Sequence, residues 1–161
     1  MQTGQFVRRE PGKLHLQHIS ERLSAYMSVS GQRASKNLDS SEKFSLGGAN
    51  GVRAYPTGEA SGDSGYLATA ELRYTMSFAA VPGVLQPFVF VDSGGVTINE
   101  NPFAAGANDR HLSAAGFGLT WVRANDFQVK LTLAKRLGNQ ASTASDTDRR
   151  TRGWVQAIKY F

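Results

Sequence analysis

The sequence predicts an all-β protein, a segment of an antiparallel transmembrane β-barrel. Several stretches alternate apolar and polar side chains with a period of two residues, which is the pattern of strands that have one apolar face. The connections between these stretches alternate between short and long, as they do in membrane barrels. A mean hydropathy of only −0.33 also fits, because barrel strands turn every second side chain toward a polar lumen.

The N-terminal half contains predicted strands at about 12–19, 23–30 and 65–78. The stretch 65–78 is the clearest, since it exceeds the usual length of about 5 to 6 residues and suits a tilted membrane strand of about 9 to 11. Its alternation predicts three lipid-facing side chains, Leu72, Tyr74 and Met76. Its other face is expected to line the lumen with Thr69, Glu71 and Arg73.

The C-terminal half adds predicted strands at about 84–98, 113–121, 127–134 and 151–161, which brings the total to about seven. The stretch 127–134 alternates regularly. We therefore expect Lys130 to point into the lumen. The opposite face is expected to meet lipid through Val129, Leu131 and Leu133.

The connections fall into two length classes. Short turns are predicted at 20–22, 79–83 and 124–126, the second of them because of Pro82-Gly83. Long loops rich in Gly, Asn, Ser and Asp are predicted at 36–64, 99–110 and 139–150. Since the two classes alternate along the chain, the turns are expected at one end of the strands and the loops at the other.

The longest predicted loop carries a motif. A Leu46-Gly47-Gly48 segment is followed by Val52-Arg53-Ala54-Tyr55. This stretch resembles the loop signature of ShlB/FhaC/HecB-type haemolysin secretion/activation proteins, the transporters of two-partner secretion, in which Val-Arg-Gly-Tyr follows Leu-Gly-Gly. Val52, Arg53 and Tyr55 match the signature, and Ala54 stands where the family has glycine.

A second motif supports the resemblance. Phe90, Asp92 and Gly94 match the family's Phe-x-Asp-x-Gly on an inward-facing barrel strand. The resemblance implies that the long loop folds into the lumen as a plug and that its arginine, Arg53, meets Asp92. The strand pattern agrees, because Asp92 shares one face with Phe90, and a guanidinium can form forked bonds with a carboxylate.

The chain ends in an aromatic strand. Trp154, Tyr160 and the terminal Phe161 resemble the signal that the barrel-assembly machinery reads. The family combines periplasmic polypeptide-transport-associated domains with a barrel of about sixteen strands, and no stretch here resembles the periplasmic domains. Residues 1–161 are therefore interpreted as the C-terminal part of the barrel, and about seven strands would leave edges unpaired in lipid, so we expect a fragment.

The resemblance implies an outer-membrane translocator for a large haemolysin- or haemagglutinin-like exoprotein. The implied partners are that secreted exoprotein, the barrel-assembly machinery and outer-membrane lipid, and the implied location is the cell outer membrane. Two alternatives stay open at this point. One is an outer-membrane protein assembly factor of the same superfamily, and the other is a soluble β-barrel that binds a small ligand.

Composition argues against other functions. The 18 Lys+Arg against 13 Asp+Glu give a net charge of +5, but the basic residues are scattered and form no nucleic-acid groove. The chain has no Cys, and His15 and His18 fall on opposite faces of a strand, so neither predicts a metal site. Gly62-Asp63-Ser64-Gly65 copies part of a serine protease motif without a matching histidine context. We predict no enzyme activity, cofactor, metal or nucleic-acid partner.

Overall fold

The computed structural model describes residues 7–103, 105–144 and 148–160, and within them it is all-β and antiparallel, as predicted. The long strands of this described part form one sheet: β1 (Val7–His18), β2 (Leu23–Ala34), β5 (Ser64–Tyr74), β7 (Val81–Thr97), β8 (Asp109–Arg123), β9 (Phe127–Arg136) and β10 (Thr151–Lys159). The shorter strands are β6 (Met76–Phe78), which pairs with β7, and the pair β3 (Phe44–Ser45) and β4 (Ser61–Gly62). The described residues include no helix that is long and apolar enough to cross a membrane.

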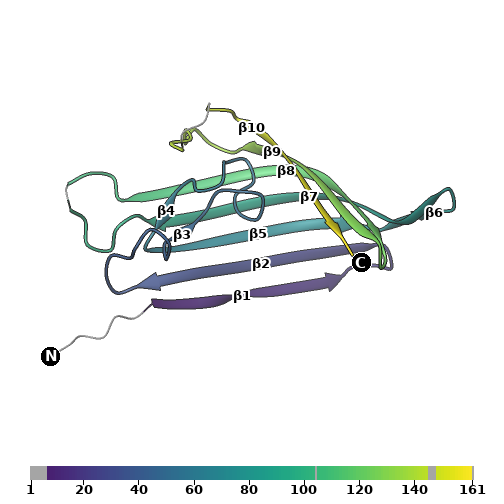
Figure 1. Ribbon diagram of the computed structural model, residues 1–161, viewed down its shortest axis with the longest axis horizontal. Coiled ribbons are helices and arrows are strands. Elements are labelled where there is room, and N and C mark those ends of the chain that lie inside the picture. Colours follow the sequence, from purple (N-terminus) through teal and green to yellow (C-terminus); the bar gives the residue numbers. More distant parts are fainter. Residues whose placement is uncertain (1–6, 104, 145–147, 161) are drawn as a thin grey trace.

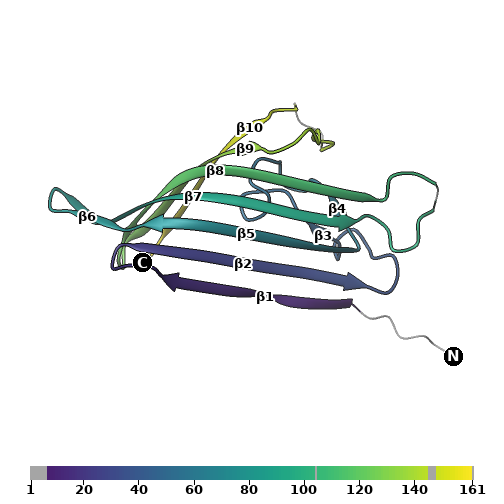
Figure 2. The ribbon, with the colours of Figure 1, turned by 180° about the vertical axis from the view of Figure 1, so that it is seen from behind.

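The sheet is an up-and-down meander with the order β1-β2-β5-β7-β8-β9-β10 (Figure 1). Each long strand pairs antiparallel with the long strand that precedes it in the sequence. The sheet is curved, and β10 runs across the direction of the earlier strands in both views (Figures 1 and 2). β1 and β10 are the outermost strands of the described sheet, which therefore has the form of a partial barrel.

Loops and turns lie at opposite ends of the strands, as predicted (Figure 1). The predicted turns at 20–22 and 124–126 are present. The predicted turn at 79–83 is wrong in its position, because it consists of Ala79-Ala80, while Pro82 and Gly83 belong to β7. The pairing of β7 with β8 begins only at Val84, so the missing N–H of Pro82 removes no bond from that ladder.

The predicted strand at 65–78 is interrupted at Thr75, which separates β5 from β6. β2 starts at Leu23, opposite Tyr74, and the Thr75 amide donates to the Arg22 carbonyl in the preceding turn. Beyond this point the chain has lost β2 as a neighbour, and β6 continues as a hairpin with β7 alone. β1 also begins earlier than predicted, with a shift of register between Glu10 and Lys13.

The two faces of the sheet differ as the alternation predicts. On β7, Val89 and Val91 are 55% and 50% exposed, whereas Phe88, Phe90 and Asp92 are buried. The predicted outward orientation is confirmed for four residues that are exposed on the convex face, Leu72, Tyr74, Leu131 and Leu133. Met76 and Val129 are partly exposed.

The concave face is covered by the connection between β2 and β5, residues 35–63, which we call the inner loop. Its buried residues Leu46, Val52 and Tyr55 pack against the inner face of the sheet. The apolar core thus lies between the loop and the sheet, and its sheet-borne members are Phe88, Phe90, Val96, Leu112, Ala114 and Ala134. This arrangement brings the motif of the loop against the motif of β7.

Candidate functional site

The tip of the inner loop is a compact turn held by backbone bonds. The Val52 amide donates to the Leu46 carbonyl at 2.7 Å, and the Gly48 amide donates to the Tyr55 carbonyl at 3.1 Å. A side chain at Gly51 would place Cβ 2.0 Å from the Leu46 carbonyl oxygen, so only glycine fits there. This packing presents the buried Arg53 to the inner face of the sheet.

Arg53 meets Asp92, as the two motifs imply. Arg53 Nη2 lies 2.7 Å from Asp92 Oδ1, and Arg53 Nε lies 2.8 Å from Asp92 Oδ2. The Arg53 amide donates to the same Oδ2 at 3.1 Å, and the Thr69 hydroxyl donates to Oδ1 at 3.0 Å. Asp92 is fully buried. The forked geometry fixes the direction as well as the distance of the contact, which is why an arginine suits this position better than a lysine.

Glu71 on β5 is a second partner of Arg53. Arg53 Nη1 lies 2.6 Å from Glu71 Oε1, and Arg73 binds the other oxygen of Glu71 at 2.5 Å and 2.8 Å. Lys130 on β9 lies 3.8 Å from Glu71. The predicted inward orientation of Glu71, Arg73 and Lys130 is confirmed by these contacts. We call Arg53, Asp92 and Glu71 the tip site.

The spacing of the β7 motif follows from these contacts. The Arg53 guanidinium lies 3.4 Å from the centre of the Phe90 ring, a cation–π contact. At Gly94 an added Cβ would approach Leu46 Cδ2 to 2.6 Å. Phe90, Asp92 and Gly94 therefore share the inner face of one strand, and each provides a surface for a different part of the loop.

Strand β10 also holds the tip. The Trp154 indole N–H donates to the Arg53 carbonyl at 2.7 Å, so this side chain lies on the inner face. Its predicted role in barrel assembly stays a prediction. Tyr160 is 47% exposed, and Phe161 lies outside the described residues. The Trp154 contact was missed in the sequence because an aromatic residue in a strand does not reveal which loop it meets.

Ala54 takes the glycine position of the loop signature without strain. Among the described residues other than glycine, positive φ occurs at Ala60 and Asn125. Ala54 is fully buried against the sheet. The substitution of glycine by alanine therefore leaves the geometry of Arg53 intact.

The sequence of this chain matches one known protein family over most of its length. The sequence profile of the family described as haemolysin secretion/activation protein ShlB/FhaC/HecB matches residues 14–146. The chain belongs to the ShlB/FhaC/HecB family. Its similarity to this family covers the inner loop, the β7 motif and most of the sheet.

Related proteins place the chain within longer sequences. It is 29% identical over 150 residues to the heme/hemopexin transporter protein HuxB of Haemophilus influenzae strain 86-028NP, and 30% identical to HuxB of strain Rd. Each alignment covers 91% of this chain and 26% of the relative. The solved structure of CdiB from Acinetobacter baumannii matches with a TM-score of 0.64 at 21% identity over 91% of this chain and 26% of CdiB. The chain thus spans about a quarter of the length of the curated relatives and of the solved structure that it matches.

Proposed function

We propose that this protein supplies part of the barrel of an outer-membrane translocator, which moves a large haemolysin- or haemagglutinin-like exoprotein across the outer membrane. The proposal gives it a secreted partner and no enzymatic reaction. The observation that carries it is the tip site. Arg53 joins the inner loop to Asp92 on β7 and Glu71 on β5, so the loop is held in the interior of the curved sheet.

The outer face supports a location in lipid. Large apolar side chains are exposed on several neighbouring strands of the convex face, including Met27 on β2, Leu72 on β5, Val89 on β7 and Phe117 on β8. An apolar surface shared by adjacent strands is the surface that a membrane barrel presents to hydrocarbon. We propose the outer membrane as its location and the barrel-assembly machinery as the partner that inserts it.

The interior supports passage of a polar chain. A cavity of about 220 Å³ lies beside the loop tip. Its polar lining includes Tyr26, Ser28, Ser30, Asn50, Thr69 and Lys130. An unfolded exoprotein exposes backbone N–H and C=O groups, which need hydrogen-bonding partners along the path. In this mechanism the inner loop is a plug, and its contacts with the wall must rearrange before the exoprotein passes.

The test is export. The protein is expressed in the outer membrane of a Gram-negative host as part of a complete barrel, together with a haemolysin-like exoprotein, and exoprotein in the medium is measured. We expect export with the unmodified protein and with the control Arg33→Ala, whose side chain is exposed. We expect strongly reduced export with Arg53→Ala. Recovery of the protein in the soluble fraction, or a loss of other outer-membrane barrels in place of a loss of export, would contradict the translocator.

A further inference from the structure

The inner loop carries a second buried charge that the family motifs do not include. Glu59 lies six residues after Arg53 in the sequence, and its side chain is fully buried. It lies at the end of the sheet where the long loops meet. Burial of a carboxylate is costly unless it is paired and hydrogen-bonded, so its surroundings should form a binding site for it.

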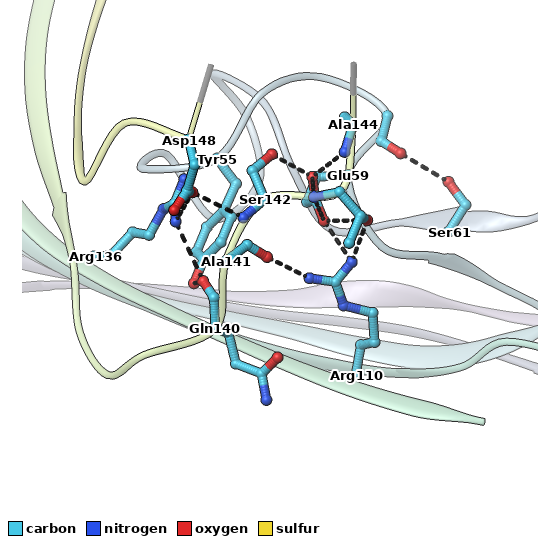
Figure 3. A network of polar contacts seen from close by, with 12 residues as sticks. Tyr55, Glu59, Ser61, Arg110, Arg136, Gln140, Ala141, Ser142, Ala144 and Asp148 are labelled. Atoms are coloured by element: carbon cyan, nitrogen blue, oxygen red, sulfur yellow. Dashed lines mark hydrogen bonds and ion pairs between the residues drawn. The ribbon is translucent and has the colours of Figure 1, made fainter. Parts of the chain in front are cut away.

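Glu59 is held by one strand and by a neighbouring loop (Figure 3). Arg110, at the start of β8, places Nη1 2.6 Å from Glu59 Oε1. The Ser142 hydroxyl donates to Oε2 at 2.6 Å, and the Thr143 hydroxyl donates to Oε1 at 3.0 Å. The amides of Thr143 and Ala144 donate to Oε2 at 3.0 Å and 2.9 Å. We call Glu59, Arg110 and these donors the rim site.

The donors at 142–144 belong to the loop between β9 and β10. Residues 140–144 of this loop, which we call the strap, lie across the inner loop (Figure 3). The Tyr55 hydroxyl donates to the Gln140 carbonyl at 3.0 Å, and Arg110 Nη2 donates to the Ala141 carbonyl at 2.8 Å. The strap thus contacts the inner loop at Tyr55 and Glu59, with Arg110 beside both.

We propose that Glu59 is the latch of a strap: residues 140–144 close over the inner loop by binding this carboxylate, and the closed strap retains the outer end of the loop in the barrel. This inference rests on the proposed function: if the inner loop is the plug of a translocator, the strap must open before the loop can move. The strap itself contributes exposed or partly exposed residues, and its described contacts with the inner loop are polar. The contacts of Ser142, Thr143 and Ala144 all end on one carboxylate, so neutralising that anion should loosen the strap.

The strap differs from the tip in how it is built. The tip site lies between regular strands, whose ladders hold their side chains in place. At the rim, by contrast, the backbone amides of Thr143 and Ala144 are ordered around the Glu59 carboxylate. Loss of the negative charge weakens the acceptor group that these amides and the Arg110 guanidinium share. We therefore expect the strap to detach while the tip stays in place.

The experiment uses a nitroxide label on the strap. The chain contains no cysteine, so Ala141→Cys, at an exposed position, gives a single labelling site. The protein is studied in outer-membrane vesicles, with Glu59→Gln as the latch variant. Glu42→Gln is the matched control, because it makes the same change at an exposed position of the same inner loop. Trp154 emission, in a Trp121→Phe background, reports the tip.

We expect the label to be immobilised in the unmodified protein and in Glu42→Gln. In Glu59→Gln the ratio of mobile to immobile label should rise on the order of 10-fold, because a charged hydrogen-bonding partner is lost, with Trp154 emission unchanged. If Glu59→Gln does not fold, the double variant Ser142→Ala/Thr143→Ala removes the strap hydroxyls instead and should give a smaller increase. An immobile label in a folded latch variant overturns the proposal.

The two proposals fail differently. If the label is released in Glu59→Gln but the unmodified protein exports no exoprotein, the strap stands and the translocator is rejected. If the unmodified protein exports its partner and the label stays immobile in Glu59→Gln, the translocator stands and the strap is rejected. A change of Trp154 emission together with the label would mean general unfolding and would also reject a separate latch.

Discussion

The inner loop is held by two buried carboxylate sites of opposite construction. At the tip site the loop supplies the cation, Arg53, and the strands supply the carboxylates of Asp92 and Glu71. At the rim site the loop supplies the carboxylate, Glu59, and a strand supplies the cation, Arg110. The tip site is embedded in β-ladders, whereas the rim site depends on a second loop. One loop can therefore have both a fixed contact and a conditional one.

The largest effect is expected from Arg53→Ala. This change leaves Asp92 and Glu71 buried without their shared cation, so the free energy of unfolding should fall by about 3 to 5 kcal/mol. Asp92→Ala should cost less, about 2 to 3 kcal/mol, because Arg53 keeps Glu71 as a partner. Urea unfolding in lipid vesicles measures both. An equal or larger loss in Asp92→Ala would show that Glu71 does not share the arginine.

The next effect tests the close packing of the tip. Gly94→Val places Cβ within 2.6 Å of Leu46 Cδ2 and should cost about 1 to 3 kcal/mol through overpacking. The matched control is Gly106→Val, since an added Cβ at Gly106 meets nothing within 4 Å. Unfolding in the same vesicles measures the pair. If both variants unfold alike, the loop does not pack on Gly94 as closely as described.

A smaller effect is expected at β10. Trp154→Phe keeps an aromatic ring and removes the indole donor to the Arg53 carbonyl, so the loss should be about 1 kcal/mol. Trp121→Phe is the control, because its indole donates to Pro82 at the turn end, far from the tip. Loop release can be followed by limited proteolysis. Equal rates of proteolysis in the two variants would show that β10 does not hold the tip of the inner loop.

Acidification should separate the two sites most clearly, although it concerns a contact that is fully retained at neutral pH. Burial alone would raise the pKa of Glu59, but hydrogen bonds from Ser142, Ala144 and Thr143 lower the pKa to about 2. A carboxylate with a lowered pKa stabilises the folded state above its unfolded pKa, and this contribution is lost as the pH falls. The strap should therefore be retained at pH 5 and released between about pH 4.5 and 2.

Label mobility on the strap, titrated with acid, measures this release. Arg110 from β8 and the Arg136–Asp148 pair beside the strap are the other charged groups nearby. Glu59→Gln serves as the control, because its label should already be mobile at neutral pH and should show no further release as the pH falls. A strap that is released already at pH 6, or release with the same midpoint in Glu59→Gln, would contradict the assignment to Glu59.

The tip site was predictable from the sequence because its carboxylates lie on regular β-strands. The period-2 alternation places Phe90, Asp92 and Gly94 on one face of a strand, and the family resemblance supplies Arg53 as the partner. The same alternation gives the orientation of Glu71 and Lys130. These features depend on strand geometry, which a local pattern of side chains records.

The rim site was not predicted, because it joins loops that have no periodicity. A faint signal does exist. Continuing the alternation of β8 back from the buried Leu112 places Arg110 on the inner face, where a cation needs a carboxylate. Nothing in the sequence identifies Glu59 as that partner. The error at Pro82-Gly83 has a related cause, since a turn-forming dipeptide is also tolerated at a strand end whose neighbour has not yet begun.

The central claim is that Arg53 and Asp92 hold the inner loop through one shared interaction, and a double-mutant cycle tests it most directly. The unfolding free energy is measured in lipid vesicles for the unmodified protein, Arg53→Ala, Asp92→Ala and the double variant. The two single changes delete the same contact, so the double variant should lose less than their sum, with a coupling of about 1 to 3 kcal/mol. Losses that add within about 0.5 kcal/mol would contradict the account.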